Sequence, residues 1–292
     1  MIISAITDGI SNQMFQYACG KSLSIEHHTE FLIDISWFEN IESRFTTRLF
    51  LLNKFHITAN IADNKQIRAF KEPKYPPIIN SIYWRWQYAL PYYKRKEFKE
   101  TKSGYDSNIW KSSKSIHLSG FWQSYKYFEN IRTVLLKEFM PKNISENNQV
   151  IAKSILNNDD SVSIHFRRGD YVNSQNTHYC LPQSYYTQAI EFIKSKVANI
   201  HLYVFSDDPE WVFENIKFTC DYTLIQHNKS NPEIDIYLMS CCKHNIIANS
   251  SFSWWGAWLN QNEKKIVVAP DKWLNYNFKS TVDLIPSDWF KL

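Results

Sequence analysis

Residues 162–171 read Val162-Ser163-Ile164-His165-Phe166-Arg167-Arg168-Gly169-Asp170-Tyr171. Apolar and polar side chains alternate as far as Phe166, and this period of two is typical of a β-strand. Because alternate residues of a strand point to the same face, His165 and Arg167 share one face where the strand ends. The stretch therefore predicts a buried strand that brings two polar side chains to one edge of a sheet.

The second half of the chain alternates strands with helices. Further strands are expected at 200–205, 223–225, 245–248 and 266–269, and helices at 149–156, 181–197, 209–216, 232–240 and 254–259. Strands separated by helices form parallel sheets, because each crossover helix returns the chain to the same end of the sheet. The pattern predicts a doubly wound parallel sheet, in which ligands bind beyond the carboxyl ends of the strands.

The first half begins with the same order. A strand at 2–6, a helix at 12–25 and a strand at 31–33 indicate a second parallel α/β region, whereas residues 36–142 show no clean period. Pro141 and the polar run 143–148 indicate a seam between domains. We therefore expect two domains, residues 1–148 and 149–292.

The composition is that of a folded, aromatic-rich protein. The 292 residues are 44% hydrophobic and 16% aromatic, and their net charge of +4 is too small to indicate nucleic-acid binding by itself. The five cysteines lack C-x-x-C spacing, which argues against a disulfide framework or a zinc site. No apolar run reaches the roughly 18–20 residues of a membrane span, and the N-terminus does not resemble a signal peptide, so we expect a soluble, cytoplasmic protein.

Arg167 is the candidate for holding a diphosphate. A guanidinium binds phosphate oxygens in bidentate fashion and stays charged at any working pH. The alternative is that Arg167 or Arg168 pairs with Asp170 and braces the loop. His165, on the same face as Arg167, is a candidate ligand contact, and its alternative is an ordinary core or surface histidine.

Two more loops follow strand ends in this half. In Asp207-Asp208-Pro209 one aspartate suits the N-cap of the next helix, and the other is a candidate for hydrogen bonds to a nucleotide base or ribose. Before the helix expected at 254, hydroxyls and free N–H groups are a candidate anion cradle. The residues of this cradle are Ser250, Ser251, Phe252 and Ser253. The alternative is that the serines only cap the helix. If the sheet is as predicted, the three loops converge. The loop after the first strand, with Asn12 and Gln13, is expected to face them from the other domain.

Three segments carry a resemblance to a known family: Gly9–Ala18, His165–Tyr171 and Ser251–Trp258. They read G-I-S-N-Q-M-F-Q-Y-A, H-F-R-R-G-D-Y and S-F-S-W-W-G-A-W, and together they resemble the α1,2-fucosyltransferase family. Segments 120–124 and 205–211 are also similar, so the resemblance spans most of the chain. It implies an α/β fold of the GT-B type, with two Rossmann-like domains facing a central cleft.

The resemblance also implies an inverting transfer from GDP-fucose that needs no metal ion and no cofactor. Arg167 would hold the β-phosphate, and His165 with Asp207 or Asp208 would contact guanosine. Ser251, Phe252 and Ser253 would line the diphosphate pocket, and the acceptor would bind mainly to the first domain. Asp8 and Ser11 stand where the family commonly has glycine, so the backbone of this loop is expected to differ. His165, Asp8 and Asp34 all remain candidates for a general base.

The expected function is a galactoside α1,2-L-fucosyltransferase that acts on a terminal or internal galactose in bacterial surface polysaccharide (O-antigen) synthesis. The rival hypotheses are a fucosyltransferase of another linkage, such as α1,6, and a non-catalytic glycan-binding protein. Nucleic-acid binding is not expected. The basic, aromatic stretch from Trp84 to Lys102 is typical of a solvated face, and the alternative is docking on the anionic inner face of the inner membrane. The sequence leaves the oligomeric state open.

Overall fold

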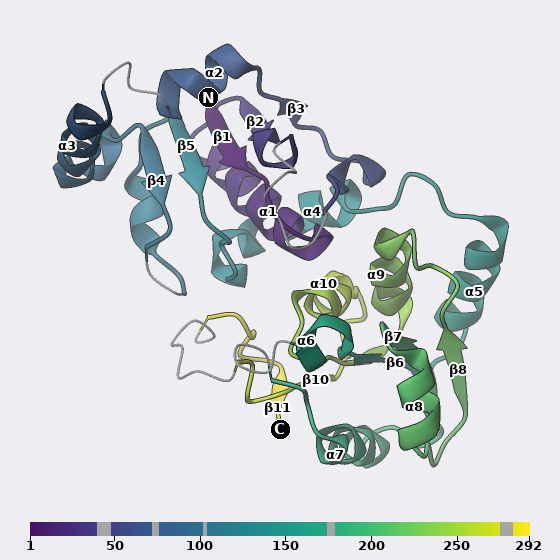
Figure 1. The fold of residues 1–292 in the computed structure, drawn as a ribbon. Helices are drawn as coiled ribbons and strands as arrows, with labels where there is room; N and C mark the ends of the chain where they lie inside the picture. Colours follow the sequence, from purple (N-terminus) through teal and green to yellow (C-terminus); the bar gives the residue numbers. More distant parts are fainter. Residues whose placement is uncertain (40–47, 72–75, 102–103, 174–178, 275–282) are drawn as a thin grey trace. The chain divides into compact units, whose positions relative to one another are not determined.

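The computed structural model describes residues 1–39, 48–71, 76–101, 104–173, 179–274 and 283–292. The chain forms two compact units, Met1–Phe139 with Lys279–Leu284 and Met140–Phe278 with Ile285–Leu292 (Figure 1). This division comes earlier than the seam expected at 148/149, because Asn148 already hydrogen-bonds Asn228 (3.0 Å) inside the second unit. Each unit contains its own parallel sheet.

The sheet of the second unit has its strands in the order β11-β10-β9-β6-β7-β8, all paired in parallel. The bounds are β6 Ser161–Phe166, β7 His201–Ser206, β8 Tyr222–Ile225, β9 His244–Ile246, β10 Val267–Ala269 and β11 Phe290–Lys291. β6 is buried along its whole length, and its polar Ser163 accepts a hydrogen bond from the Asn245 side chain (2.7 Å). The doubly wound sheet that the sequence predicts is confirmed.

Helices cover both faces of this sheet (Figure 1). α7 (Gln183–Lys194) and α8 (Pro209–Asn215) pack on the face that carries Val162, Ile164 and Phe166. α5 (Glu146–Leu156), α9 (Pro232–Cys241) and α10 (Ser251–Leu259) lie on the other face. α9 and α10 approach closely at Gly256, where an added Cβ atom would lie 2.6 Å from the Cβ of Met239. A glycine is therefore needed at this crossing.

Two differences from the sequence prediction bear on the site. Helix α10 begins at Ser251 rather than at 254, because Ser250 caps it by accepting the Phe252 N–H (3.3 Å). A short helix, α6 (Gly169–Asn173), follows β6 where only a loop was expected. A helix of five residues is too short to show an apolar period, so the sequence pattern gives no signal for it.

The sheet of the first unit has its strands in the order β3-β2-β1-β5-β4, also all parallel. The strands are β1 Ile2–Ala5, β2 Phe31–Asp34, β3 Asn60–Ile61, β4 Glu97–Lys99 and β5 Ile116–Ser119. The helices are α1 Ile10–Glu26, α2 Asn64–Lys71, α3 Pro77–Ala89 and α4 Arg132–Glu138, with 3₁₀ turns at Ser36–Phe38, Leu52–Lys54, Tyr92–Lys94, Ser107–Lys111, Tyr125–Tyr127 and Glu129–Ile131. Within the described ranges, no helix combines the length and apolar character needed to cross a bilayer.

Candidate active site

The candidate site lies at the carboxyl ends of β6, β7 and β9, which are neighbours in the second sheet. The chain runs from β6 through β7 to β8 and then returns to β9 on the other side of β6, so the strand order reverses between β6 and β9. Ligands of doubly wound sheets bind at such a reversal. The loops that follow these three strands meet here through side-chain contacts, as the sequence predicts.

Arg167 pairs with Asp207 across the two central strands. The guanidinium Nη1 lies 2.8 Å from Asp207 Oδ2, and both side chains are about one-quarter exposed. The guanidinium also lies 5.4 Å from the ring centre of Tyr171. The side chain of Asp170, the partner considered from sequence, lies outside the described residues. Asp207 therefore orients Arg167 while a quarter of the arginine stays accessible to a ligand.

Arg168 and Asp208 support the loop. The Arg168 guanidinium lies 3.6 Å from the ring centre of Trp211, and its Nε lies 3.4 Å from Asp208 Oδ2. Asp208 also caps α8 by accepting the Trp211 N–H (3.2 Å), which confirms that one aspartate of the pair is an N-cap. The backbone N–H of Arg168 donates to Asp207 Oδ1 (2.8 Å). The two aspartates thus have different tasks, and Asp207 is the one that faces Arg167.

His165 is buried beside these residues, with 3% of its surface exposed. Its ring centre lies 5.5 Å from that of Phe252, at the start of α10. Burial lowers the pKa of His165 to about 4, an effect that the Asp207 carboxylate opposes and the Arg167 guanidinium reinforces. The imidazole is therefore neutral at physiological pH. Its buried Nδ1 has no hydrogen-bond partner among the described residues, which marks it as available to a polar ligand atom.

The serines around the start of α10 differ in accessibility. Ser250 and Ser253 are buried, whereas Ser251 and Phe252 are partly exposed. The Ser253 hydroxyl accepts the Ala248 N–H (3.2 Å) and donates to the Ser250 carbonyl (3.4 Å), so it holds the turn together. Ser250 is the N-cap. Of this group, Ser251 and Phe252 are the residues placed to meet a ligand at the helix N-terminus.

The loops after β6 and β9 are joined to each other. The Tyr171 hydroxyl donates to the Asn249 carbonyl (3.1 Å), and the Asn249 side chain donates to the carbonyls of Tyr179 (2.7 Å) and Trp273 (2.9 Å). At Gly169 an added Cβ atom would lie 2.9 Å from Asp207 Oδ2. A glycine at this position lets the carboxylate reach the backbone N–H of Arg168.

Asp235 is a residue of this sheet edge that the sequence reasoning missed. It lies near the start of α9, in the connection that follows β8, and its carboxylate accepts a hydrogen bond from Asn228 (2.8 Å). Burial raises the pKa of Asp235 to about 6, and the nearby Glu233 adds to the effect while the Asn228 hydrogen bond opposes it. Its place between the buried Ile234 and Ile236 in the first turn of α9 is the signal that was available. Raised carboxyl pKa values are common at functional sites.

The candidates from the first half lie in the first unit. Gln13 is fully buried: its amide donates to the carbonyls of Asp8 and Leu49 (both 2.8 Å) and accepts the Leu51 N–H (2.9 Å), so it braces the loop. Asn12 accepts from the Gln123 side chain (2.8 Å) and is partly exposed. Asp8 has a φ of 65°, in the left-handed region that favours glycine.

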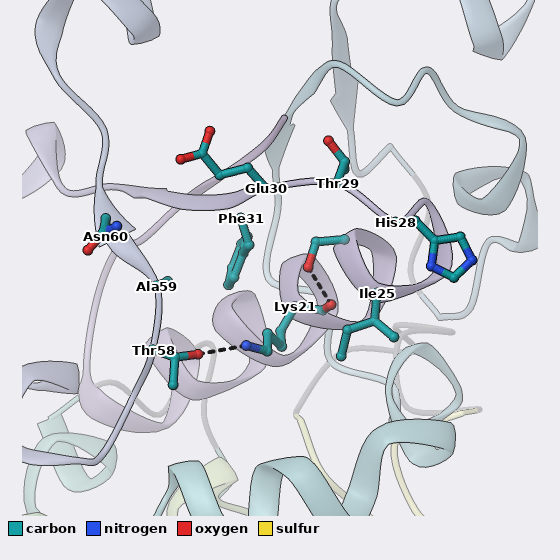
Figure 2. Close-up of a pocket in the computed structure, with 10 residues that line it drawn as sticks. Lys21, Ile25, His28, Thr29, Glu30, Phe31, Thr58, Ala59 and Asn60 are labelled. Carbon is teal, nitrogen blue, oxygen red and sulfur yellow. Dashed lines mark hydrogen bonds between the residues drawn. The ribbon is translucent and has the colours of Figure 1, made fainter.

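Asp34 and one pocket of the first unit are accounted for by contacts within that unit. Asp34 is 1% exposed and lies 3.0 Å from His117 Nε2. The pocket, of about 580 Å³, lies at the amino ends of β2 and β3, away from the sheet edge where ligands bind (Figure 2). In its wall Lys21 donates to the Thr58 hydroxyl (2.7 Å) and pairs with Glu138 (2.9 Å), so its charge is already compensated.

The whole chain, residues 1–292, matches the family model described as glycosyl transferase family 11. An alpha-1,2-colitosyltransferase of Escherichia coli is 32% identical, and the alignment covers 100% of this chain and 99% of that protein. The O-antigen biosynthesis glycosyltransferase WbnK of Escherichia coli is also 32% identical, with 99% of each chain covered. Among solved structures, the fucosyltransferase NodZ from Bradyrhizobium is similar with a TM-score of 0.52 and 13% identity, covering 87% of this chain and 91% of that chain.

The expected fold class is confirmed by the two parallel α/β sheets and by this likeness: two Rossmann-like domains of the GT-B type. The facing of the two domains across a cleft stays a prediction. Among the residues that the structure describes, no three His, Cys, Asp or Glu side chains gather in a metal-binding arrangement.

Proposed function

Because this chain belongs to glycosyl transferase family 11, we propose that it transfers L-fucose from GDP-fucose to a galactose hydroxyl of a glycan, forming an α1,2 linkage with inversion. The match confirms the family inferred from the three sequence motifs, and the chain is a glycosyltransferase. The observation that carries the finer proposal is the meeting of Arg167, Asp207 and the neutral His165 at the reversal of strand order.

Arg167 suits the leaving group of this reaction. As the bond from the anomeric carbon to GDP breaks, negative charge develops on the β-phosphate, and a cation already in position stabilises that charge. A guanidinium has five N–H donors, so Arg167 can keep its contact with Asp207 and hold phosphate oxygens as well. The charge that the reaction needs is then supplied by the protein itself, and we expect turnover without a divalent metal ion.

His165 fits a contact with the nucleoside better than a role as base. With a pKa of about 4 it is a weak proton acceptor, and efficient general bases have pKa values near the operating pH. Asp34 is held by His117, which leaves Asp8, after β1, as the partly exposed carboxylate among the candidates. Orientation of the acceptor and stabilisation of the departing GDP supply most of the acceleration in this proposal.

A second donor is favoured by one relative. Colitose is L-fucose without its 3-hydroxyl group, and the similarity to an alpha-1,2-colitosyltransferase extends over the full chain. A site that hydrogen-bonds this hydroxyl rejects the deoxy sugar by about 10⁴-fold, whereas an apolar surface discriminates only about 100-fold. The ratio of kcat/KM for GDP-fucose and GDP-colitose decides between the two donors.

The decisive experiment measures GDP release from GDP-fucose in EDTA, with and without lactose as acceptor. We expect acceptor-dependent release that survives EDTA and falls about 100- to 1000-fold in Arg167→Ala. The exposed Arg85→Ala is the matched control and should retain wild-type turnover. An Arg167→Ala enzyme with near-normal turnover would refute the assigned role.

Product analysis and nucleotide titration separate the rivals. NMR of the product distinguishes an α1,2 from an α1,6 linkage. Oligosaccharide binding without GDP binding would favour a non-catalytic glycan-binding protein. Within the proposal the enzyme acts in the cytoplasm on a galactose-containing precursor of bacterial surface polysaccharide, a role supported by the O-antigen function in the name of WbnK.

A further inference from the structure

Helix α3 turns apolar side chains outward. Ile78, Ile82 and Trp86 follow one another every four residues, so they form one stripe along the helix, and they are 79%, 63% and 55% exposed. Ile79 flanks this stripe and is also exposed. A helix that serves only its own fold faces its apolar stripe toward the core. On α3 this aliphatic stripe faces outward instead, whereas Tyr83, Trp84 and Tyr88 are half-buried.

The inward side of α3 is fixed by polar contacts. Gln87 is buried and accepts the Lys96 N–H (3.3 Å), and the Tyr88 hydroxyl donates to Glu97 (3.1 Å). Arg95 donates to the carbonyls of Tyr88 (2.7 Å) and Leu90 (2.9 Å). These bonds attach α3 to the segment of β4, at the edge of the first sheet (Figure 1). The outward stripe is therefore held in a defined orientation.

The charged residues of α3 and of the segment that follows it are sorted by sign. The exposed basic residues are Arg85, Lys94, Lys96 and Lys99. The acidic residues described in the same segment bond within the fold: Glu97 accepts from Tyr88, and Glu100 accepts the N–H groups of Phe121 (2.7 Å) and Trp122 (3.2 Å). Lys102, the last member of the basic stretch, lies outside the described residues. Among the described residues of α3 and the segment to Glu100, the exposed charge is thus positive.

We propose that this face docks on an anionic lipid bilayer. The face, here called the α3 surface, consists of Ile78, Ile79, Ile82 and Trp86 with Arg85, Lys94, Lys96 and Lys99. A helix with an apolar stripe and flanking cations lies in the plane of the membrane interface, where acyl chains receive the stripe and headgroup phosphates receive the cations. Trp86 suits this boundary, since its ring is apolar and its N–H is polar. The attachment does not depend on the proposed sugar transfer.

Other occupants match the surface less well. Nucleic acid would use the cations and aromatic rings, but exposed isoleucines contribute nothing to phosphate binding or base stacking. In a twofold dimer the same patch meets itself, so the cations of one copy would lie near those of the other. An anionic bilayer satisfies the apolar stripe and the cations together.

The test is co-sedimentation of the full chain with vesicles of phosphatidylcholine containing phosphatidylglycerol, at 50 mM and 500 mM salt. Binding is expected at low salt and should weaken at high salt and with phosphatidylcholine alone. Ile78→Glu/Ile82→Glu should bind at least tenfold more weakly. Val150→Glu, another exposed aliphatic residue but on α5, is the control and should bind like wild type.

A charge series and a fluorescence signal complete the test. Lys94→Ala/Lys96→Ala should lose about 25-fold, or about fivefold for each cation. Lys142→Ala/Lys153→Ala removes the same charge from the second unit and should lose little. The blue shift of tryptophan emission on adding vesicles should disappear in Trp86→Phe.

Three outcomes would overturn the proposal. The first is no binding of wild type to anionic vesicles at low salt, including the case in which single-stranded DNA binds instead. The second is an equal loss of vesicle binding in the two double-lysine variants, which would indicate that binding depends on net charge alone. The third is that wild type forms a dimer in light scattering and binds no vesicles, while Ile78→Glu/Ile82→Glu is a monomer. Turnover on lactose should be unchanged in the α3 variants, which separates failure of docking from failure of the enzyme.

Discussion

Asp235→Asn is expected to stabilise the protein at neutral pH. Burial raises the pKa of Asp235 to about 6, from an ordinary value of 3.8 in an accessible chain. Between these two pH values the unfolded chain has released the proton while the folded chain keeps it, so the free energy of unfolding falls as the pH rises. Above pH 6 the loss reaches its full size of about 3 kcal/mol, since each pH unit between the two pKa values corresponds to about 1.4 kcal/mol.

Asparagine keeps the shape and still accepts the hydrogen bond from Asn228, but it carries no charge to desolvate. In thermal unfolding at pH 8 we expect the variant to melt roughly 6–12 °C higher than wild type, and at pH 4 the two should melt within about 2 °C of each other. Asp159→Asn is the control, because that side chain is 97% exposed, and it should change neither value. Equal melting of Asp235→Asn and wild type at pH 8 would refute the reasoning, because the carboxylate would then cost nothing on folding.

Other predictions concern the neighbouring residues. Asp207→Asn should lower kcat about tenfold without abolishing GDP binding, because Arg167 keeps its charge but loses its orienting partner; isothermal titration and steady-state rates check this, and loss of all GDP binding would contradict it. Gly169→Ala should raise KM for GDP-fucose, since the new Cβ would displace the Asp207 carboxylate, and an unchanged KM would mean that this contact is dispensable. For His165 the folded pKa of about 4 lies below the ordinary histidine value of 6.5, so wild-type stability should fall as the pH drops from 6.5 to 4. In His165→Gln the free energy of unfolding, measured by urea titration, should change less with pH between 6.5 and 4. An unaltered pH dependence would show that other groups cause it.

The second unit was predictable because its strands carry a simple pattern. β6 alternates apolar and polar residues, and its two serines are satisfied inside the sheet, Ser161 by the Lys243 N–H and Ser163 by the Asn245 side chain. Caps were readable too: Asp208 before Pro209 indicates a helix start, and the structure confirms it. The start of α10 was predicted too late because Ser251 and Ser253 resemble loop residues. Both lie within the first turn of the helix, which Ser250 caps.

The middle of the first unit could not be predicted for a different physical reason. Strands β3 and β4 have two and three residues, which is too short for a period to be recognised. In α3 the outward stripe of isoleucines is mixed with inward Gln87 and Tyr88, so the usual rule that apolar residues face the core gives no consistent face. A helix whose apolar side is reserved for a partner outside the fold defeats the pattern that identifies ordinary helices.

The partner of Arg167 shows how far a single sequence leads at the site. Asp170 was considered because it is near in sequence, whereas Asp207 is far away along the chain. In the sheet, Phe166 pairs with Ser206, so the next residues on the two parallel strands, Arg167 and Asp207, come to lie opposite each other. The pairing thus follows from the register of β6 against β7 and not from either loop. Recognising the two strands as neighbours was within reach of the sequence, but fixing their register required the tertiary packing.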